Sequence, residues 1–316
     1  MKCARSQLAA RRVWPHHMVM DKTPDILCIG SVLWDLIGRS SAHMRAGSDV
    51  PGRIARLPGG VALNIAMTLR RFDLRPALLS AVGRDVEGRA LIETCDAMGL
   101  LTDFIYRSDD LPTDRYMAIE GGNGLIAAIA DAHSLEAAGD KILAPLSDGR
   151  LGSVTQPYEG MIALDGNLTA ALLGEISESP LFAEADLRVA PASPGKAERL
   201  LPFLRHANST IYVNLEEAGL LLHRNCATAP EAAEMLIAQG ARRVLVTDGG
   251  RVAALAQAGS VVAAQPPAVL VTRVTGAGDT FMAAHIAAER RGDDTAQALD
   301  AALKAAAAYV SGDVHT

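Results

Sequence analysis

The sequence predicts an α/β fold: a doubly wound, mostly parallel sheet flanked by helices, with a small β lid. From Asp25 onward, short apolar runs alternate with Ala-rich segments of helical periodicity. Parallel strands need crossover connections of helical length, so this alternation favours a doubly wound sheet. The chain of 316 residues is long enough to bury a large core in one α/β domain, alone or with a small accessory domain.

The apolar runs and helical patterns give the expected order of elements. Strands are predicted at residues 26–31, 77–82, 161–164, 187–190, 210–213, 243–247 and 252–255. Helices are predicted at 61–72, 86–98, 168–177, 195–204, 216–222, 231–239, 279–290 and 295–309. The Ala-rich stretch of the last helix has good helix propensity, so we interpret it as a helix rather than a linker.

Two segments break this alternation, at about residues 38–56 and 104–120. Neither has a helical period, and they flank the first two βα units. We expect both to leave the main sheet and to form a small β cover. Such a cover would overhang the strand ends where ligands bind in open α/β sheets.

Composition excludes several classes of protein. The net charge is −6, and no block of Lys and Arg is interleaved with aromatic residues, which argues against nucleic acid as a partner. No apolar run is long enough to span a membrane. Cys3, Cys28, Cys95 and Cys226 lack the spacing of a zinc site, so they are interpreted as reduced, mostly buried thiols of a cytoplasmic protein.

Residues 1–24 differ from the rest of the chain. The first twenty contain Arg5, Arg11 and Arg12 but no acidic residue, which is a composition that transit peptides share. An Arg-rich disordered tail, or a start codon placed too early (with Met18 or Met20 as the true start), is the preferred interpretation. We therefore assign the fold to residues 25–316.

The most informative motif is Thr275-Gly276-Ala277-Gly278-Asp279, which is followed by an apolar helical run. Small residues permit a tight turn, and the unpaired amides at a helix start attract anions. A carboxylate beside an anion site is what phosphoryl transfer to an alcohol requires. The motif alone is equally an ordinary helix start with a favourable first-turn Asp.

Candidate ligand-binding residues also occur between the first predicted strand and the end of the first predicted helix. Asp35 comes after the first strand and could accept hydrogen bonds from substrate hydroxyls, or cap a turn. Gly59 and Gly60 precede a helix that carries Asn64 in its first turn. These glycines permit close approach of the backbone to a ligand that Asn64 could also reach, although a diglycine before a helix is common.

Three later strand ends carry similar residues. Asn167 lies two residues past Asp165, after a predicted strand, where it could meet a ligand or form an Asx turn. Asn214 and Glu217 have the spacing of a capping box, or could hold water-coordinated Mg²⁺. Thr247 and Gly249 suit a tight turn that could also touch a nucleotide phosphate.

The order of these motifs resembles the ribokinase-like (PfkB) family of carbohydrate and nucleoside kinases, over residues 25 to about 311. The resemblance implies a family lid, ATP and Mg²⁺ as cofactors, a small sugar or nucleoside as substrate, and in many relatives a homodimer through the lid. It also implies roles for the motif residues. Asp279 would be the general base, and the amides of Gly276, Ala277 and Gly278 would form the anion hole.

The same resemblance implies the remaining site residues. The sugar would be held by Asp35, Gly59, Gly60, Asn64 and Asn167. Mg²⁺ and phosphates would be organised by Asn214 and Glu217, with Glu217 reaching the metal through water. Thr247 and Gly249 would lie along ATP.

Four phrases are similar to pseudouridine kinases within the family, at residues 60–66, 113–116, 128–131 and 164–168. They imply the 5′-hydroxyl of pseudouridine as the acceptor. The alternatives are a kinase for another pentose or nucleoside, such as ribose or adenosine, and a non-catalytic sensor on the same fold. An NAD-binding oxidoreductase is excluded because no G-x-G-x-x-G follows the first strand.

One position departs from the family pattern. Relatives carry Asp three residues before the Gly-Ala-Gly-Asp motif, where it helps to hold an activating monovalent cation. Here the residue is Arg273, whose permanent positive charge cannot ligate K⁺. We hypothesise that Arg273 takes the cation's place or disables that site.

Overall fold

The computed structural model describes residues 23–45 and 47–312. Its main sheet has eight strands in the order β14-β13-β12-β11-β10-β9-β1-β4. The pairs from β12 to β4 are parallel, while β13 and β14 are antiparallel additions at one edge. The eight strands are β1 (Ile26–Ile29), β4 (Pro76–Leu79), β9 (Met161–Asp165), β10 (Asp186–Ala190), β11 (Ser209–Asn214), β12 (Arg243–Thr247), β13 (Ala253–Gln257) and β14 (Ser260–Ala264). The predicted doubly wound α/β class is confirmed.

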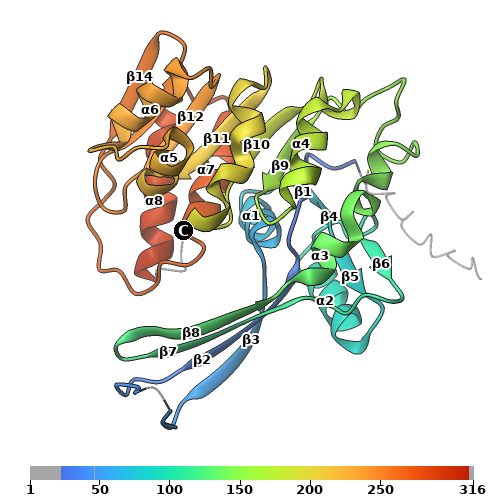
Figure 1. Cartoon of the computed structure of the whole chain (residues 1–316), viewed down its shortest axis with the longest axis vertical. Helices are drawn as coiled ribbons and strands as arrows, with labels where there is room; N and C mark the ends of the chain where they lie inside the picture. The colour runs from blue at the N-terminus through green and yellow to red at the C-terminus, as the bar shows by residue number, and fades with distance from the viewer. Residues whose placement is uncertain (1–22, 46, 313–316) are drawn as a thin grey trace, which may run out of the picture.

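Helices cover both faces of this sheet (Figure 1). Two separate apolar cores result, one on each face. The first face packs against α3 (His133–Ala138), η1 (Gly139–Leu146), α4 (Ala170–Glu178), η2 (Pro180–Phe182), η3 (Pro194–Arg205), α5 (Leu215–Leu222) and α6 (Ala229–Ala238). The second packs against α1 (Val61–Arg71), α2 (Val86–Ala97), α7 (Ala277–Arg290) and α8 (Thr295–Ser311).

A second, four-stranded sheet projects from the body of the molecule (Figure 1). Its order is β3-β2-β7-β8, from β3 (Arg53–Gly59), β2 (Leu33–Arg39), β7 (Arg115–Gly121) and β8 (Gly124–Asp131). The strand β2 pairs antiparallel with β3 and parallel with β7. We call this element the projecting sheet. It includes residues 38–39 and 53–56 of the first segment that lacks a helical period, and residues 115–120 of the second.

The boundaries of those segments need correction. Residues 104–114 do not enter the projecting sheet, because β6 (Tyr106–Ser108) pairs instead with β5 (Ala81–Gly83) in a small separate sheet. The strand β8 lies outside the predicted range 104–120. Seven of its eight residues are exposed, so its sequence lacks the alternation that marks a half-buried strand.

Two further expectations differ from the structure. The predicted helix at 195–204 is the 3-10 helix η3, which contains Pro194 at its start and Pro202 inside. A proline inside a helix removes a backbone donor and clashes with the preceding turn, so a regular α-helix is disfavoured here. The strand β14 was not expected. The proposed N-terminal extension falls at residues 1–24, of which 1–22, Cys3 included, lie outside the described residues.

Cys28, Cys95 and Cys226 are free, and the first two are buried. Within residues 23–45 and 47–312, no helix is long and apolar enough to cross a membrane.

Candidate active site

The glycine-rich turn leads directly into α7, at the carboxyl edge of the main sheet. Gly276 is the residue before the helix and has φ +87°, a left-handed conformation that favours glycine. Asp279 lies in the first turn of α7, directly after Ala277 and Gly278. Asn64 of α1 donates from Nδ2 to Asp279 Oδ2 at 2.9 Å, so two motifs 215 residues apart meet here.

The electrostatic setting of Asp279 favours its protonated form. Burial raises its pKa to about 7, and the hydrogen bond from Asn64 opposes this shift only in part. The carboxylates of Asp165, Asp35 and Glu217 add to the increase. A carboxyl group with a pKa near neutrality is well matched to act as a general base at that pH.

The three amides of the glycine-rich turn differ in their bonding. The amide of Ala277 donates to the Val274 carbonyl at 3.0 Å, which closes the turn. The amides of Gly276 and Gly278 have no acceptor among the described residues. These two amides are therefore the ones available to an anion in this structure, beside the positive end of the α7 dipole.

The sequence position of Asp35 suggested a loop after the first strand, but the structure places it elsewhere. It is the third residue of β2, in the projecting sheet. A Cβ at Gly59 of the neighbouring β3 would lie 2.0 Å from Asp35 Oδ2, so only glycine admits the carboxylate at this point. Burial raises the pKa of Asp35 to about 6. Gly60, with φ +99°, turns the chain from β3 into α1.

Asn167 belongs to a polar network at the same edge. Its Nδ2 donates to Ser31 Oγ at 3.0 Å, and its Oδ1 accepts from Lys196 Nζ at 2.5 Å. The buried Asp165 accepts from both the amide and the hydroxyl of Ser31, at 2.8 and 2.5 Å. The amide of Asn167 is thus oriented from both sides.

The sequence analysis did not single out Ser31 or Lys196. Ser31 follows β1 and Lys196 follows β10, so both come after a strand at the edge where the other candidates lie. The rule that identified Asp35 and Asn214, a polar side chain just past an apolar run, would have found Ser31 but not Lys196, which lies further from β10, within η3. No motif drew attention to either residue.

Asn214 and Glu217 form the capping box that their spacing allows. Asn214 Oδ1 accepts from the Glu217 amide and Glu217 Oε2 accepts from the Asn214 amide, both at 2.8 Å. Glu217 is buried, and burial raises its pKa to about 7. Thr247 is paired with Asn214 on neighbouring strands, and Gly249, with φ +56°, turns the chain toward β13.

The chemistry of Glu217 fits Mg²⁺ that is bound through water. Only one oxygen of Glu217 is engaged in the capping box, which leaves the other without a donor among the described residues. No group of three or more acidic, His or Cys side chains in residues 23–45 and 47–312 could hold a metal directly. A single buried carboxylate fits magnesium that keeps most of its waters and binds through substrate phosphates.

Arg273 lies in the loop before α7 and packs against α8. Its Nε donates to the Tyr309 carbonyl at 2.7 Å, and its guanidinium carbon is 3.8 Å from the centre of the Tyr309 ring. A cation near the carbonyl end of a helix is favourable, and so is a guanidinium over an aromatic face. The positive charge at this position is therefore fixed in place by α8.

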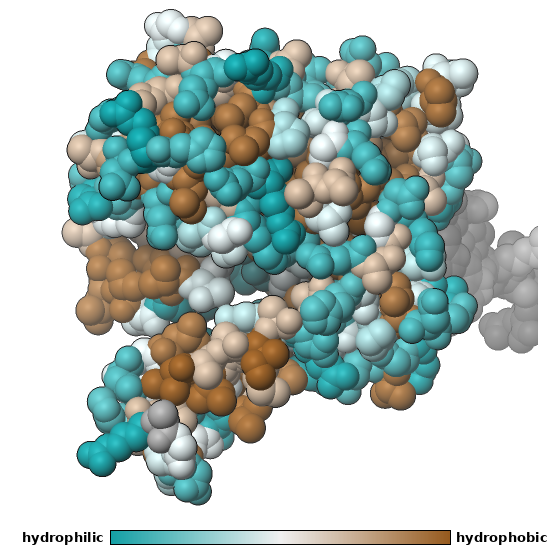
Figure 2. All heavy atoms as spheres, in the orientation of Figure 1, coloured by the Kyte–Doolittle hydropathy of each residue, from teal (hydrophilic) through white to brown (hydrophobic). Residues whose placement is uncertain are grey.

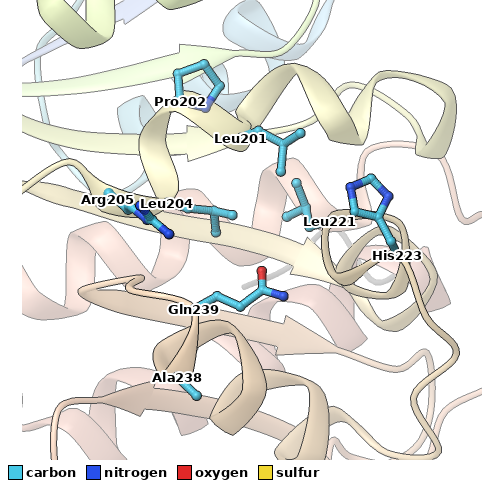
Figure 3. Close-up of a pocket in the computed structure, with 8 residues that line it drawn as sticks. All are labelled: Leu201, Pro202, Leu204, Arg205, Leu221, His223, Ala238 and Gln239. Atoms are coloured by element: carbon cyan, nitrogen blue, oxygen red, sulfur yellow. The ribbon is translucent and has the colours of Figure 1, made fainter.

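A cavity of about 620 Å³ lies elsewhere, between η3, α5 and α6 (Figure 3). Apolar side chains of Leu201, Leu204 and Leu221 line its centre, and Arg205, Gln239 and His223 lie around it. It contains none of the residues discussed above. The carboxyl edge of the sheet, where the polar side chains converge, is the candidate active site.

The chain matches the model of the pfkB family of carbohydrate kinases over residues 23–313. Among characterised relatives, it is 28% identical to the bifunctional protein HldE of Hyphomonas neptunium, over 89% of this chain and 58% of that protein. It is 27% identical to the pseudouridine kinase of Escherichia coli, over 82% of this chain and 81% of that one. It is 26% identical to the ribokinase of Bacillus subtilis, over 90% of this chain and 92% of that one.

Solved structures share the fold. A carbohydrate kinase from Agrobacterium tumefaciens superposes with a TM-score of 0.77 at 24% identity, over 93% of each chain. A ribokinase from Arabidopsis thaliana, solved with ribose and ATP, gives 0.74 at 19% identity, over 91% of this chain and 92% of that one. The architecture is therefore the ribokinase fold.

The sequence match identifies the family within that fold. The chain belongs to the pfkB family of carbohydrate kinases. It spans less than two thirds of the length of its HldE relative, at 58%.

Proposed function

We propose that this chain is an ATP-dependent kinase that transfers a phosphoryl group to a primary hydroxyl of a nucleoside or sugar. The observation that carries the proposal is the start of α7, where a carboxyl group with a pKa near 7 stands beside two amides without acceptors. A base and an anion site in adjacent residues match the two needs of phosphoryl transfer to an alcohol.

In this reaction Asp279 accepts the proton of the attacking hydroxyl. The amides of Gly276 and Gly278 stabilise the charge on the transferring phosphoryl group, and Ala277 closes the turn through Val274. Asn64 orients the base through its hydrogen bond to Oδ2. A non-catalytic sensor would have no use for a base at this point, which argues for the enzyme over the sensor.

The other site residues divide between acceptor and nucleotide. Asp35, Gly59, Gly60 and Asn167 lie where they would bind the acceptor's hydroxyls. Asn214 and Glu217 would hold the magnesium waters that accompany ATP, while Thr247 and Gly249 would lie along the nucleotide. When bound, Mg²⁺ would neutralise phosphate charge.

We take the 5′-hydroxyl of pseudouridine as the preferred acceptor. Four sequence phrases resemble pseudouridine kinases, and a pseudouridine kinase is among the relatives. Ribose is the principal alternative acceptor, since this chain is 26% identical to a ribokinase and 27% identical to a pseudouridine kinase.

We propose further that the enzyme needs no monovalent cation, because the Arg273 guanidinium supplies a fixed positive charge beside the Tyr309 carbonyl. The cation is thereby replaced by a side chain that cannot dissociate.

A homodimer through the projecting sheet is the partner we propose. Alternation and register place Ile54, Met117, Ile119 and Ile129 on the face opposite Asp35, and all four are at least 38% exposed. Apolar side chains are visible over this sheet in Figure 2. An exposed apolar sheet face suits a second copy of the chain. We expect light scattering at micromolar protein concentration to give the mass of a dimer. The mass of a monomer would contradict this proposal.

One assay tests the catalytic proposal: ATP consumption with Mg²⁺ against a panel of nucleosides and free sugars, with and without K⁺. We expect pseudouridine to give the fastest turnover and K⁺ to change it little. Preference for ribose or adenosine would reassign the acceptor. ATP consumption that no acceptor stimulates would contradict the kinase proposal, and a steep rise with K⁺ would contradict the role of Arg273.

A further inference from the structure

A tyrosine of the last helix contacts the glycine-rich turn. Tyr309, in the last turn of α8, donates from its hydroxyl to the Thr275 carbonyl at 2.8 Å. Its ring lies under the Arg273 guanidinium, whose Nε also binds the Tyr309 carbonyl. Burial raises the pKa of Tyr309, so its hydroxyl remains a donor at neutral pH. These three contacts join α8 to the chain just before the turn, at Arg273 and Thr275.

The approach of this tyrosine is close enough to restrict the turn's sequence. A Cβ at Gly276 would lie 2.6 Å from the Tyr309 hydroxyl oxygen. Gly276 is therefore needed for two reasons, its left-handed backbone and the space taken by the tyrosine. A hydroxyl group packed this tightly restricts where the backbone of the turn can move.

The carbonyl that Tyr309 binds matters for the helix start. Thr275 directly precedes Gly276, the residue before α7, and its carbonyl accepts from the Tyr309 hydroxyl. Asp279 is the third residue of α7, so its amide is one of the first-turn donors that have no partner within a helix, and it has no acceptor among the described residues. The first turn of α7 thus keeps open amides on both sides of Ala277.

We propose that Tyr309 is a positioning residue for phosphoryl transfer, which holds the Thr275 carbonyl so that the amides of Gly276 and Gly278 stay directed at the transferring group. Arg273 supports Tyr309 through two contacts: its guanidinium stacks on the Tyr309 ring, and its Nε donates to the Tyr309 carbonyl. This inference rests on the proposed kinase activity, because the geometry it maintains is that of the anion site. Tyr309 itself touches no reacting atom.

The test is Tyr309→Phe, which keeps the ring under Arg273 and removes only the hydroxyl. The matched control is Tyr106→Phe, a tyrosine of β6 that also lies near a cation, Lys141, at 5.6 Å. We expect kcat to fall about tenfold, as for one lost hydrogen bond that acts in the transition state, with little change in the KM for the acceptor. Calorimetry should show weaker binding of ADP with aluminium fluoride but unchanged binding of ADP alone.

Hydrogen exchange gives a readout that does not require activity. The peptide covering residues 272–280 should exchange faster in Tyr309→Phe than in the wild type or the Tyr106→Phe control. Unchanged exchange there would overturn the inference even if no acceptor were found for the enzyme. Active protein with an unchanged kcat would overturn it as well, and so would equal losses of ADP and ADP–aluminium fluoride binding. Failure of the kinase proposal itself would appear instead as an inactive wild type.

Discussion

The two ends of α7 carry carboxylates in opposite situations. Asp279, at the start, receives one hydrogen bond from a neutral amide and has acidic neighbours. Glu289, near the end, binds the guanidinium groups of Arg188 and Arg243. Burial raises the pKa of Asp279 to about 7. Burial would also raise the pKa of Glu289, but the two arginines outweigh it and hold this pKa below its usual range.

This difference is contrary to what the helix dipole alone would give. A negative charge is favoured at the start of a helix and disfavoured at its end. Here the acid at the favoured end is the one whose ionisation is made costly, so neighbouring side chains outweigh the dipole. Glu289, which is paired with two arginines, is the carboxylate that stabilises the fold. Asp279, which has no cationic partner among the described residues, is the candidate for catalysis.

The largest effect is expected from Asp279→Asn. The amide cannot accept the hydroxyl proton, so kcat should fall about 10³-fold, as for loss of a general base. Since ionised Asp279 is disfavoured in the folded protein, wild-type stability falls as pH rises from its ordinary pKa toward about 7. The variant should therefore be more stable than the wild type at pH 8 and gain less at pH 5.

Turnover assays and urea unfolding at both pH values measure these effects. Asp300→Asn, in an exposed ion pair on α8, is the control. Near-normal turnover in Asp279→Asn would show that another group removes the proton.

The second effect is on stability at the other end of α7. Glu289→Gln leaves the buried Arg188 and the partly buried Arg243 without their shared carboxylate, although Asp186 still pairs with Arg188. We expect a loss of about 2 kcal/mol in the free energy of unfolding. This is less than the ~3–5 kcal/mol of a fully buried pair, because the Glu289 side chain is 20% exposed and Arg188 keeps one partner. Activity should stay near that of the wild type, because Glu289 lies three helical turns from Asp279.

Urea unfolding of Glu289→Gln beside Glu198→Gln checks this. Glu198 pairs with His223, and both side chains are more than 60% exposed, so its loss should cost under about 0.5 kcal/mol. Equal stability of the two variants would contradict the comparison between the ends of α7.

A third effect is the pH dependence of turnover. The base must be ionised to accept a proton, so kcat/KM should fall about tenfold per pH unit below pH 7, with saturating Mg²⁺ and ATP. Glu217→Gln should keep the shape of this profile, since its carboxyl group is not the base, but move it slightly to lower pH, because the Glu217 carboxylate adds to the raised pKa of Asp279. A profile that stays flat from pH 8 to pH 5 would contradict the environment assigned to Asp279.

Local sequence signals predicted the fold class well because alternation, glycine turns and capping pairs are read within a few residues. The spacing of Asn214 and Glu217 allowed a capping box, and the structure has one. Contacts set by the sheet order were beyond such signals. Arg188 and Glu289 are 101 residues apart, and they meet only because β10 lies near α7.

The site shows the same division. The glycine-rich turn and Asn64 were recognisable as motifs, but nothing local links Tyr309 to Thr275, 34 residues before it. Asp35 was assigned to a loop because the chain leaves β1 for the projecting sheet within a few residues. Exposed β8 lacks the alternating pattern that would have marked it.

The smallest effect, and the sharpest distinction between a capping role and a metal role, is expected from Glu217→Gln. Gln can still accept from the Asn214 amide, so the capping box should persist and stability should change by less than about 0.5 kcal/mol. The charge is lost, so the Mg²⁺ concentration for half-maximal turnover should rise severalfold. Glu231→Gln is the control, because Glu231 likewise accepts from a backbone amide, that of Ala227, at the start of α6. If both variants keep the wild-type Mg²⁺ profile, Glu217 serves only to cap α5, and the nucleotide's metal must be held by other groups.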